Sequence, residues 1–217
     1  MTELYQLFYK DEQKQKLYPF SIPYKTEGLT IFFENHWLSQ LVMASKAEKV
    51  GVCSWKLQEK MRSRVGLRVP LTQDVLNSDY DILSLTKNSL KHTMLSHLYQ
   101  WHPSSKQTMA LLWSKLGFKI PGEVKNPIYQ NHFLAKTEIY KDYVTNFLNP
   151  AMELTMKDSE LNYLMMQPSG YSKLSREADA KSVKAKLGLD DYPLVPFILE
   201  RCFSCFAQVK GYKITYL

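Results

Sequence analysis

Two aspartates, Asp79 and Asp81, stand one residue apart in the stretch NSDYDILSLT, where an apolar run begins. Alternate side chains of an extended chain point to the same side, so this spacing presents both carboxylates together. Hard oxygen ligands of this kind suit Mg²⁺ or Mn²⁺ carrying phosphate oxygens. The pair therefore predicts a divalent metal site that holds a diphosphate; the alternative is two polar residues at a turn or strand start.

A second group of candidate residues is basic. Lys56 and Lys60, in SWKLQEK, lie four apart on one face of a predicted helix, where both can approach a diphosphate. They belong to the range Lys46–Arg68, which carries a net charge of +5 in about a tenth of the chain. The alternative is a solvated helix face.

Polar residues also interrupt two apolar regions. The stretch QNHF, Gln130–Phe133, offers Asn131 and His132 to sugar hydroxyls or to a proton, unless His132 caps the helix that follows. Glu200 and Arg201 interrupt FILERCFSCF, where a lone buried charge is costly. If the site is catalytic, Glu200 is the general base for an acceptor hydroxyl; the alternative is a structural ion pair.

Composition limits the kinds of protein this can be. The chain has 217 residues, 45% hydrophobic and 23% charged, which suits one folded domain with a sizeable core. A net charge of +7 favours a polyanionic partner such as nucleic acid, a phosphorylated substrate or an acidic membrane. The apolar runs are too short to span a bilayer, the first residues lack a secretion signal, and three cysteines suggest no disulfide framework. We therefore expect a cytoplasmic protein without a transmembrane segment.

Several familiar enzyme motifs are absent from the sequence. It contains no GxGxxG, GxxxxGK[ST], HExxH or GxSxG pattern. These absences argue against a dinucleotide enzyme, a P-loop NTPase, a zincin and an ordinary α/β-hydrolase. Cys202 and Cys205 form a CxxC, but two ligands do not complete a zinc site, and an apolar helix predicts that both are core residues.

Predicted strands and helices alternate along the chain and must position these residues. Strands are predicted at Glu3–Tyr9, in the LTIFF that follows Gly28, and in EKVGVCSW, DYDILSLT and YKITYL. Helices are predicted in ENHWLSQLV, KLQEKMRSRVG, KNSLKHTMLSHLYQWH, KQTMALLWSKLG, the segment from Thr137 that Pro150 kinks or cuts, KLSREADAKSVKAKLG and PLVPFILERCFSCFAQV. The range from Asp158 to Ser172 is expected to be a loop or lid. This order predicts a single α/β domain over residues 1–217, with a mainly parallel sheet and ligands at the carboxyl ends of its strands.

The order of certain stretches resembles a family of GT-A-type glycosyltransferases, bacterial and phage-borne, often found with surface-polysaccharide genes. The stretches are FFENHWLSQLV, KVGVCSWKLQEK, DYDIL, NHFLAKTEIYKDYVTNFLNPAMEL and FILERCFSCF. In that family a strand end similar to iGlxHYRR, an aspartate-led strand, a helix similar to NMFI…F..Y..WLF and a late helix with ER follow one another. The likeness spans most of the chain, but the His-Tyr-Arg-Arg of the family is replaced here by the four residues Cys53–Lys56.

The resemblance implies a Rossmann-like GT-A fold that binds a nucleoside-diphosphate sugar. It places Asp79 and Asp81 at the metal and diphosphate, with Mn²⁺ or Mg²⁺ as the cofactor. It places Lys56 near the phosphates, and Glu200 with Arg201 at the acceptor. The full expected set is catalytic Glu200 and His132, with Tyr9, Lys56, Lys60, Asp79, Asn131 and Arg201 binding the nucleotide sugar.

Two functions from different classes follow from these residues. The first is a glycosyltransferase whose acceptor is a glycan or a hydroxymethylated base in DNA. The second is a non-enzymatic nucleic-acid-binding or virion protein, in which lysines contact phosphate and aromatic rings stack on bases. Changes at Lys56, Lys60 and Arg62 should weaken nucleic-acid binding in the second, whereas Asp79→Ala should weaken nucleotide binding in the first.

Overall fold

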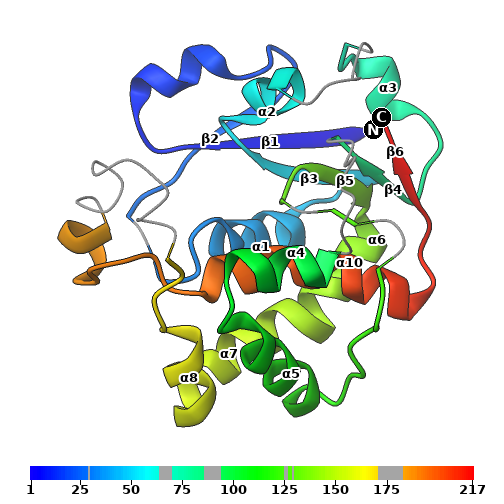
Figure 1. Cartoon of the computed structure of the whole chain (residues 1–217). Coiled ribbons are helices and arrows are strands. Elements are labelled where there is room, and N and C mark those ends of the chain that lie inside the picture. The colour runs from blue at the N-terminus through cyan, green and yellow to red at the C-terminus, as the bar shows by residue number, and fades with distance from the viewer. Residues whose placement is uncertain (29, 64–69, 86–93, 125–126, 129, 171–182) are drawn as a thin grey trace.

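The computed structural model in Figure 1 describes the chain except residues 29, 64–69, 86–93, 125–126, 129 and 171–182, and except the side chains of residues 62 and 63. A mixed sheet with helices on both faces forms a single α/β domain, so the α/β class expected from the sequence is confirmed, while the Rossmann-like GT-A arrangement stays a prediction. Within these described ranges, no helix is long and apolar enough to cross a membrane.

The sheet has six strands in the described part of the chain, in the order β2-β1-β3-β5-β4-β6. Strands β1 and β2, β1 and β3, and β4 and β6 pair in parallel, whereas β5 runs antiparallel to both β3 and β4. Five of these six strands therefore run in one direction, as expected for a mainly parallel sheet, and the antiparallel β5 makes the sheet mixed. The strands are β1 (Thr2–Phe8), β2 (Ile22–Lys25), β3 (Lys49–Ser54), β4 (Ile82–Ser84), β5 (Phe133–Lys136) and β6 (Ile214–Tyr216).

Helices cover the two faces of the sheet unequally, as Figure 1 shows. On one face lie the short helices α2 and α3; on the other lie α1, α4, α6 and α10, with α5, α7 and α8 beyond them. The helices are α1 (Glu34–Ala44), α2 (Leu57–Ser63), α3 (Gln73–Asn77), α4 (Met94–Trp101), α5 (Ser105–Lys115), α6 (Thr137–Tyr143), α7 (Asn149–Lys157), α8 (Ser159–Met165) and α10 (Val195–Lys210), with a 3-10 helix η1 (Asp11–Lys16).

Alternation along the strands builds two hydrophobic cores. Val50 and Val52 of β3 face the large core beneath the helices of the thicker layer, whereas Cys53 faces the smaller core beside α2 and α3. In β5, Phe133 belongs to the large core and Leu134 to the small one. Because both faces of the central strands are covered, all six residues of β3 are buried, and the four between Lys49 and Ser54 carry no polar side chain.

Several local predictions differ from the structure. The expected loop from Asp158 is wrong over its first half, because the Asp158 side chain accepts a hydrogen bond from the Leu161 amide and caps α8. Helix continues past Pro150, which lies in the first turn of α7 after a π-helical turn at residues 144–148. No strand forms at residues 31–33, which are turn.

The remaining predictions concern the cysteines and residues outside the described part of the chain. Cys202 and Cys205 are buried free cysteines of α10, as predicted for core residues. The first part of the charged helix expected before Gly188 lies outside the described residues, whereas residues 183–187 are helical. Arg64 and Arg68 of the basic range also lie outside them, as does the side chain of Arg62.

Candidate functional site

A cavity of about 230 Å³ opens where the parallel strands β1 and β3 end. It is slightly smaller than common small-molecule sites, which occupy roughly 300–1,000 Å³. The sequence places polar groups here because the chain leaves β1, leaves β3 and enters the antiparallel β5 at this one end of the sheet. Its lining residues are Tyr9, Phe33, Glu34, Ser54, Lys56, Lys60, Gln130, Asn131, His132, Tyr192, Pro196, Phe197 and Glu200.

Most of the site residues expected from sequence meet in this cavity. They are Tyr9, Lys56, Lys60, Asn131, His132 and Glu200. Arg201 lies directly behind, buried, with its Nη1 3.8 Å from Glu200 Oε2 and donating to the Phe197 carbonyl at 2.8 Å. Four different parts of the chain therefore contribute the expected side chains to one place.

His132 and Asn131 are held in place by buried contacts. His132 Nε2 lies 3.1 Å from Ser54 Oγ, which joins the residue before β5 to the last residue of β3. Asn131 Nδ2 donates to Asn35 Oδ1 at 3.4 Å and so ties the same segment to α1. The alternative in which His132 caps the following helix does not hold, because β5 separates the two.

Glu34 enters the cavity through an unusual backbone turn. Phe33, the residue before α1, has φ 51° and ψ −130°, a conformation that costs a residue with a side chain about 1–3 kcal/mol. The turn is secured by the Phe33 amide, which donates to the Thr30 carbonyl, and by the Asn35 amide, which donates to the Phe32 carbonyl. Phe33 also stacks on Tyr192, with ring centroids 5.4 Å apart. This turn sets Glu34 at the head of α1, facing the cavity.

The cavity contains two carboxyl groups that hold protons unusually well. Burial, and after it the charge of Glu200, raise the pKa of Glu34 to about 7, against the opposing charge of Lys56. Burial also raises the pKa of Glu200 to about 7, against the opposing charges of Arg201 and Lys60. Both groups can therefore exchange a proton near neutral pH, as a general acid or base must.

Lysines and aromatic rings cluster around two of the lining residues, Tyr9 and Lys56, and we call this cluster the aromatic rim. Lys16 and Lys56 lie over the ring of Trp55, at 4.8 and 5.3 Å from its centroid, and Lys186 lies 5.9 Å from the ring of Tyr9. Tyr9 and Trp55 meet edge to face at 6.3 Å. Each of these three lysines thus contacts a ring, and none has an ion-pair partner among the described residues.

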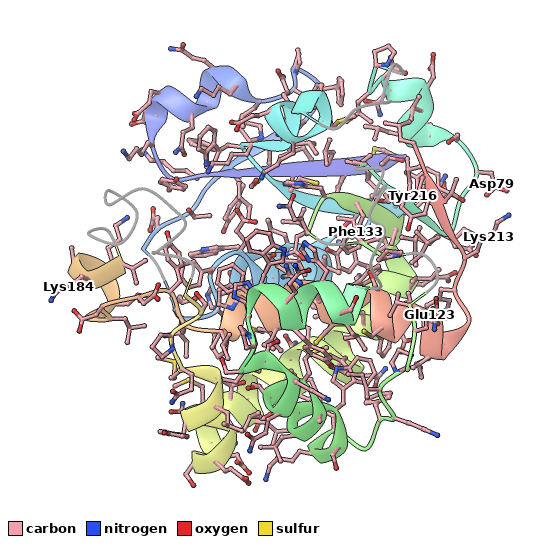
Figure 2. The ribbon with its side chains drawn as sticks, in the orientation of Figure 1. Asp79, Glu123, Phe133, Lys184, Lys213 and Tyr216 are labelled. Carbon is pink, nitrogen blue, oxygen red and sulfur yellow. The ribbon has the colours of Figure 1, made fainter. Side chains whose placement is uncertain are left out.

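The structure does not bring Asp79 or Asp81 to this cavity. Asp81 pairs with Lys136 at 2.8 Å, and Lys136 lies opposite Lys49, the first residue of β3. Since Ser54 is the last residue of β3, and a strand rises about 3.3 Å per residue, the two sites are roughly 16 Å apart along the sheet. Figure 2 shows Asp79 at one edge of the molecule, near Lys213 and far from Lys184.

The donor groups around Asp79 and Asp81 do not fit a metal site for the cavity. Asp79 is exposed, and one carboxylate oxygen of Asp81 already accepts from Lys136. Nowhere in the described part of the chain do three or more His, Cys, Asp or Glu side chains come together in a way that suits a metal ion. A divalent cation stays a prediction, and no step below depends on it.

Sequence reasoning missed several lining residues, of which Glu34 is the most important. In FFENHWLSQLV it is the first residue of the helix, a position that acidic residues commonly take because of the helix dipole. Ser54 and Gln130 adjoin residues that the sequence singles out, and among the described residues the buried side-chain oxygen of Gln130 has no hydrogen-bond partner. That oxygen lines the cavity and can accept a hydrogen bond from a ligand.

Comparisons with known proteins found no match to this chain. No protein-family model matches the chain, and neither a curated protein nor a solved structure does. The candidate site therefore rests on its own geometry.

Proposed function

We propose that the chain is a glycosyltransferase that moves a sugar from a nucleoside diphosphate to an acceptor hydroxyl in this cavity. One observation carries the proposal: Lys56 and Lys60 share the cavity with Glu34 and Glu200, two carboxyl groups with a pKa of about 7. A cavity with cations and proton-exchanging carboxyl groups suits a substrate that has a diphosphate at one end and hydroxyl groups at the other.

The proposed reaction is a single displacement. The acceptor oxygen forms a bond to the anomeric carbon, and its proton passes to the carboxylate of Glu200. The bond from that carbon to the diphosphate oxygen breaks, and its electron pair leaves with the diphosphate. Lys56 and Lys60 offset the negative charge that develops there. His132, held by Ser54, and Asn131, held by Asn35, are positioned to hydrogen-bond the sugar.

The acceptor class is also part of the proposal. A glycan and a hydroxymethylated base in DNA both present a hydroxyl group of the required kind. The aromatic rim beside the cavity favours DNA, because its lysines suit phosphates and its rings suit bases.

Ligand-dependent thermal stability tests the donor assignment. A ligand that binds only the folded state raises the melting temperature. We expect UDP, GDP, UDP-glucose or UDP-N-acetylglucosamine to raise it for the wild type, and Lys56→Met with Lys60→Met to abolish the rise. Lys106→Met, which removes an exposed lysine of α5, is the matched control. No rise with any nucleotide would contradict the proposal.

The aromatic rim also supports a second candidate, a non-enzymatic nucleic-acid-binding protein. This candidate expects a single-stranded oligonucleotide to bind with a steep salt dependence and to bind less well after Lys16→Met or Lys186→Met. It expects no effect of nucleotide sugars. Fluorescence anisotropy with a labelled oligonucleotide, run beside the thermal experiment, separates the two candidates.

A further inference from the structure

Glu34 and Glu200 reach the cavity from helices that pack against each other. Glu34 is the first residue of α1, Glu200 belongs to α10, and the two helices are in contact. Both side chains line the same cavity, and the charge of Glu200 acts on Glu34. Two carboxylates that share a desolvated site do not ionise independently, because their charges repel each other.

The surrounding charges distinguish the two carboxyl groups. Lys60 and Arg201 both stabilise the ionised form of Glu200, whereas only Lys56 does so for Glu34. The Arg201 guanidinium, 3.8 Å from Glu200, favours the ionised form of Glu200, and the charge of Glu200 in turn favours the protonated form of Glu34. The titratable groups around the pair are Tyr9 after β1, Cys53 in β3, Lys56 before α2 and Lys60 in it, His132 before β5, and Tyr192 before α10 and Arg201 in it.

The hydrogen-bonding state of Glu34 is the second relevant observation. Within the described part of the chain, no hydrogen bond or ion pair occupies its carboxyl group, although the group is half-buried. Glu200, in contrast, has the Arg201 guanidinium 3.8 Å away. A half-buried carboxyl group without a protein partner can bind a ligand at little cost, because no existing contact has to break.

We infer that Glu34 and Glu200 form one acid–base pair, in which Glu34 keeps a proton while Glu200 is ionised. The inference rests on the proposed function for its substrate. In that setting Glu200 takes the proton of the acceptor hydroxyl, and the protonated Glu34 donates a hydrogen bond to a hydroxyl of the transferred sugar. Glu34 is thereby a second functional carboxyl group of the site, beside Glu200.

A titration of the ligand-free protein tests the pair without any substrate. Glutamate side-chain carboxyl groups labelled with ¹³C are followed by NMR from about pH 4 to pH 9. We expect Glu200→Gln to lower the titration midpoint of Glu34 by about one pH unit or more, because the repelling charge is gone. Glu59→Gln, an exposed change on α2, should leave that midpoint in place. An unchanged midpoint in Glu200→Gln would overturn the pair.

Proton exchange on binding then tests the link to the substrate. We expect the wild type, near pH 7, to take up or release a fraction of a proton when it binds UDP-glucose, as measured by calorimetry in buffers of different ionisation enthalpy. Glu34→Gln and Glu200→Gln should both lose this fraction. Equal proton exchange in wild type and variants would overturn the substrate role. Failure of every nucleotide to bind would overturn the proposed function instead, and the NMR titration would still decide the pair.

Discussion

His132 Nε2 lies 3.1 Å from Ser54 Oγ, and both residues are almost fully buried at the cavity wall. The contact joins the end of β3 to the entry of β5, two strands that run in opposite directions. Because β5 is antiparallel, the residues that precede it lie beside the residues that follow β1 and β3. The contact therefore fixes the relative position of segments that are far apart in the sequence.

Ser54→Ala should destabilise the protein and loosen His132. Removing one partner of a buried hydrogen bond costs about 1–3 kcal/mol, because the other partner loses its bond without regaining water. We expect the free energy of unfolding in urea to fall by about that amount. Ser54→Thr, which keeps a hydroxyl group, serves as the matched control and should retain most of the stability. Equal stability of Ser54→Ala and wild type would show that the contact contributes nothing.

Lys56 and Lys60 should determine affinity for a nucleoside diphosphate. A hydrogen bond to a charged group is worth about 1.5–3 kcal/mol, so losing either lysine should weaken UDP binding by roughly tenfold or more. Isothermal titration calorimetry of Lys56→Met and Lys60→Met measures the change, with Lys106→Met as the control. Full UDP affinity in both variants would show that the diphosphate does not bind in this part of the cavity.

Asp79→Ala and Asp81→Asn should leave UDP affinity unchanged, with or without Mn²⁺. The reason is their location, since Asp81 pairs with Lys136 at the opposite end of β3 from the cavity. The same calorimetric titration measures both variants. Loss of Mn²⁺-dependent binding in Asp79→Ala would instead support the metal site expected from the D-x-D spacing and place the nucleotide outside the cavity.

The sequence predicts the alternation of strands and helices, and the spacing of Lys56 and Lys60, because these depend on local periodicity. It also places Asp79 and Asp81 before a strand, and this position argues against a ligand site at these two residues. In a sheet whose ligands gather at carboxyl ends, residues before a parallel strand lie at the wrong end. The direction of β5 depends on long-range pairing and could not be read from its four residues.

The approach of Glu34 to Glu200 is another feature that local pattern could not reveal. It depends on packing between α1 and α10, which lie near opposite ends of the chain. It also depends on the positive φ of Phe33, which no residue-type preference would suggest, since glycine and asparagine favour such angles. The local sequence thus identifies Glu200 as an unusual charge in an apolar segment, but it gives no sign that Glu34 lies in the same cavity.

Gly51→Ala should destabilise the centre of the sheet. A Cβ atom at Gly51 would lie 2.7 Å from Leu134 Cγ and 2.9 Å from the Phe133 carbonyl oxygen, both on the adjacent β5. Overpacking of this kind costs about 1–3 kcal/mol, and here backbone as well as side chain must move. Urea unfolding should show this loss, while Gly122→Ala, where a Cβ meets nothing within 4 Å, should stay close to wild type. Equal behaviour of the two variants would indicate that β5 can shift away from β3.

The dependence of stability on pH offers a test of the carboxyl groups that needs no ligand. The pKa of Glu200 rises from 4.5 to about 7 on folding, so between these values the folded state binds more protons than the unfolded state. Its contribution to stability is therefore present at low pH and is lost as the pH rises from 4.5 towards 7. Glu200→Gln cannot titrate and should escape this loss.

We expect the melting temperature of Glu200→Gln, relative to wild type, to increase as the pH is raised through this window and to level off above it. In a chain of this size, each kcal/mol of unfolding free energy that the variant gains over wild type should raise its relative melting temperature by about 2–4 °C. The attraction of Arg201 grows as Glu200 ionises and is part of what sets the pKa of Glu200, so its loss is included in the slope of the difference with pH. Glu59→Gln should show a flat difference, because its side chain is exposed. A flat difference for Glu200→Gln as well would mean that the carboxyl group ionises in the folded protein as readily as in water.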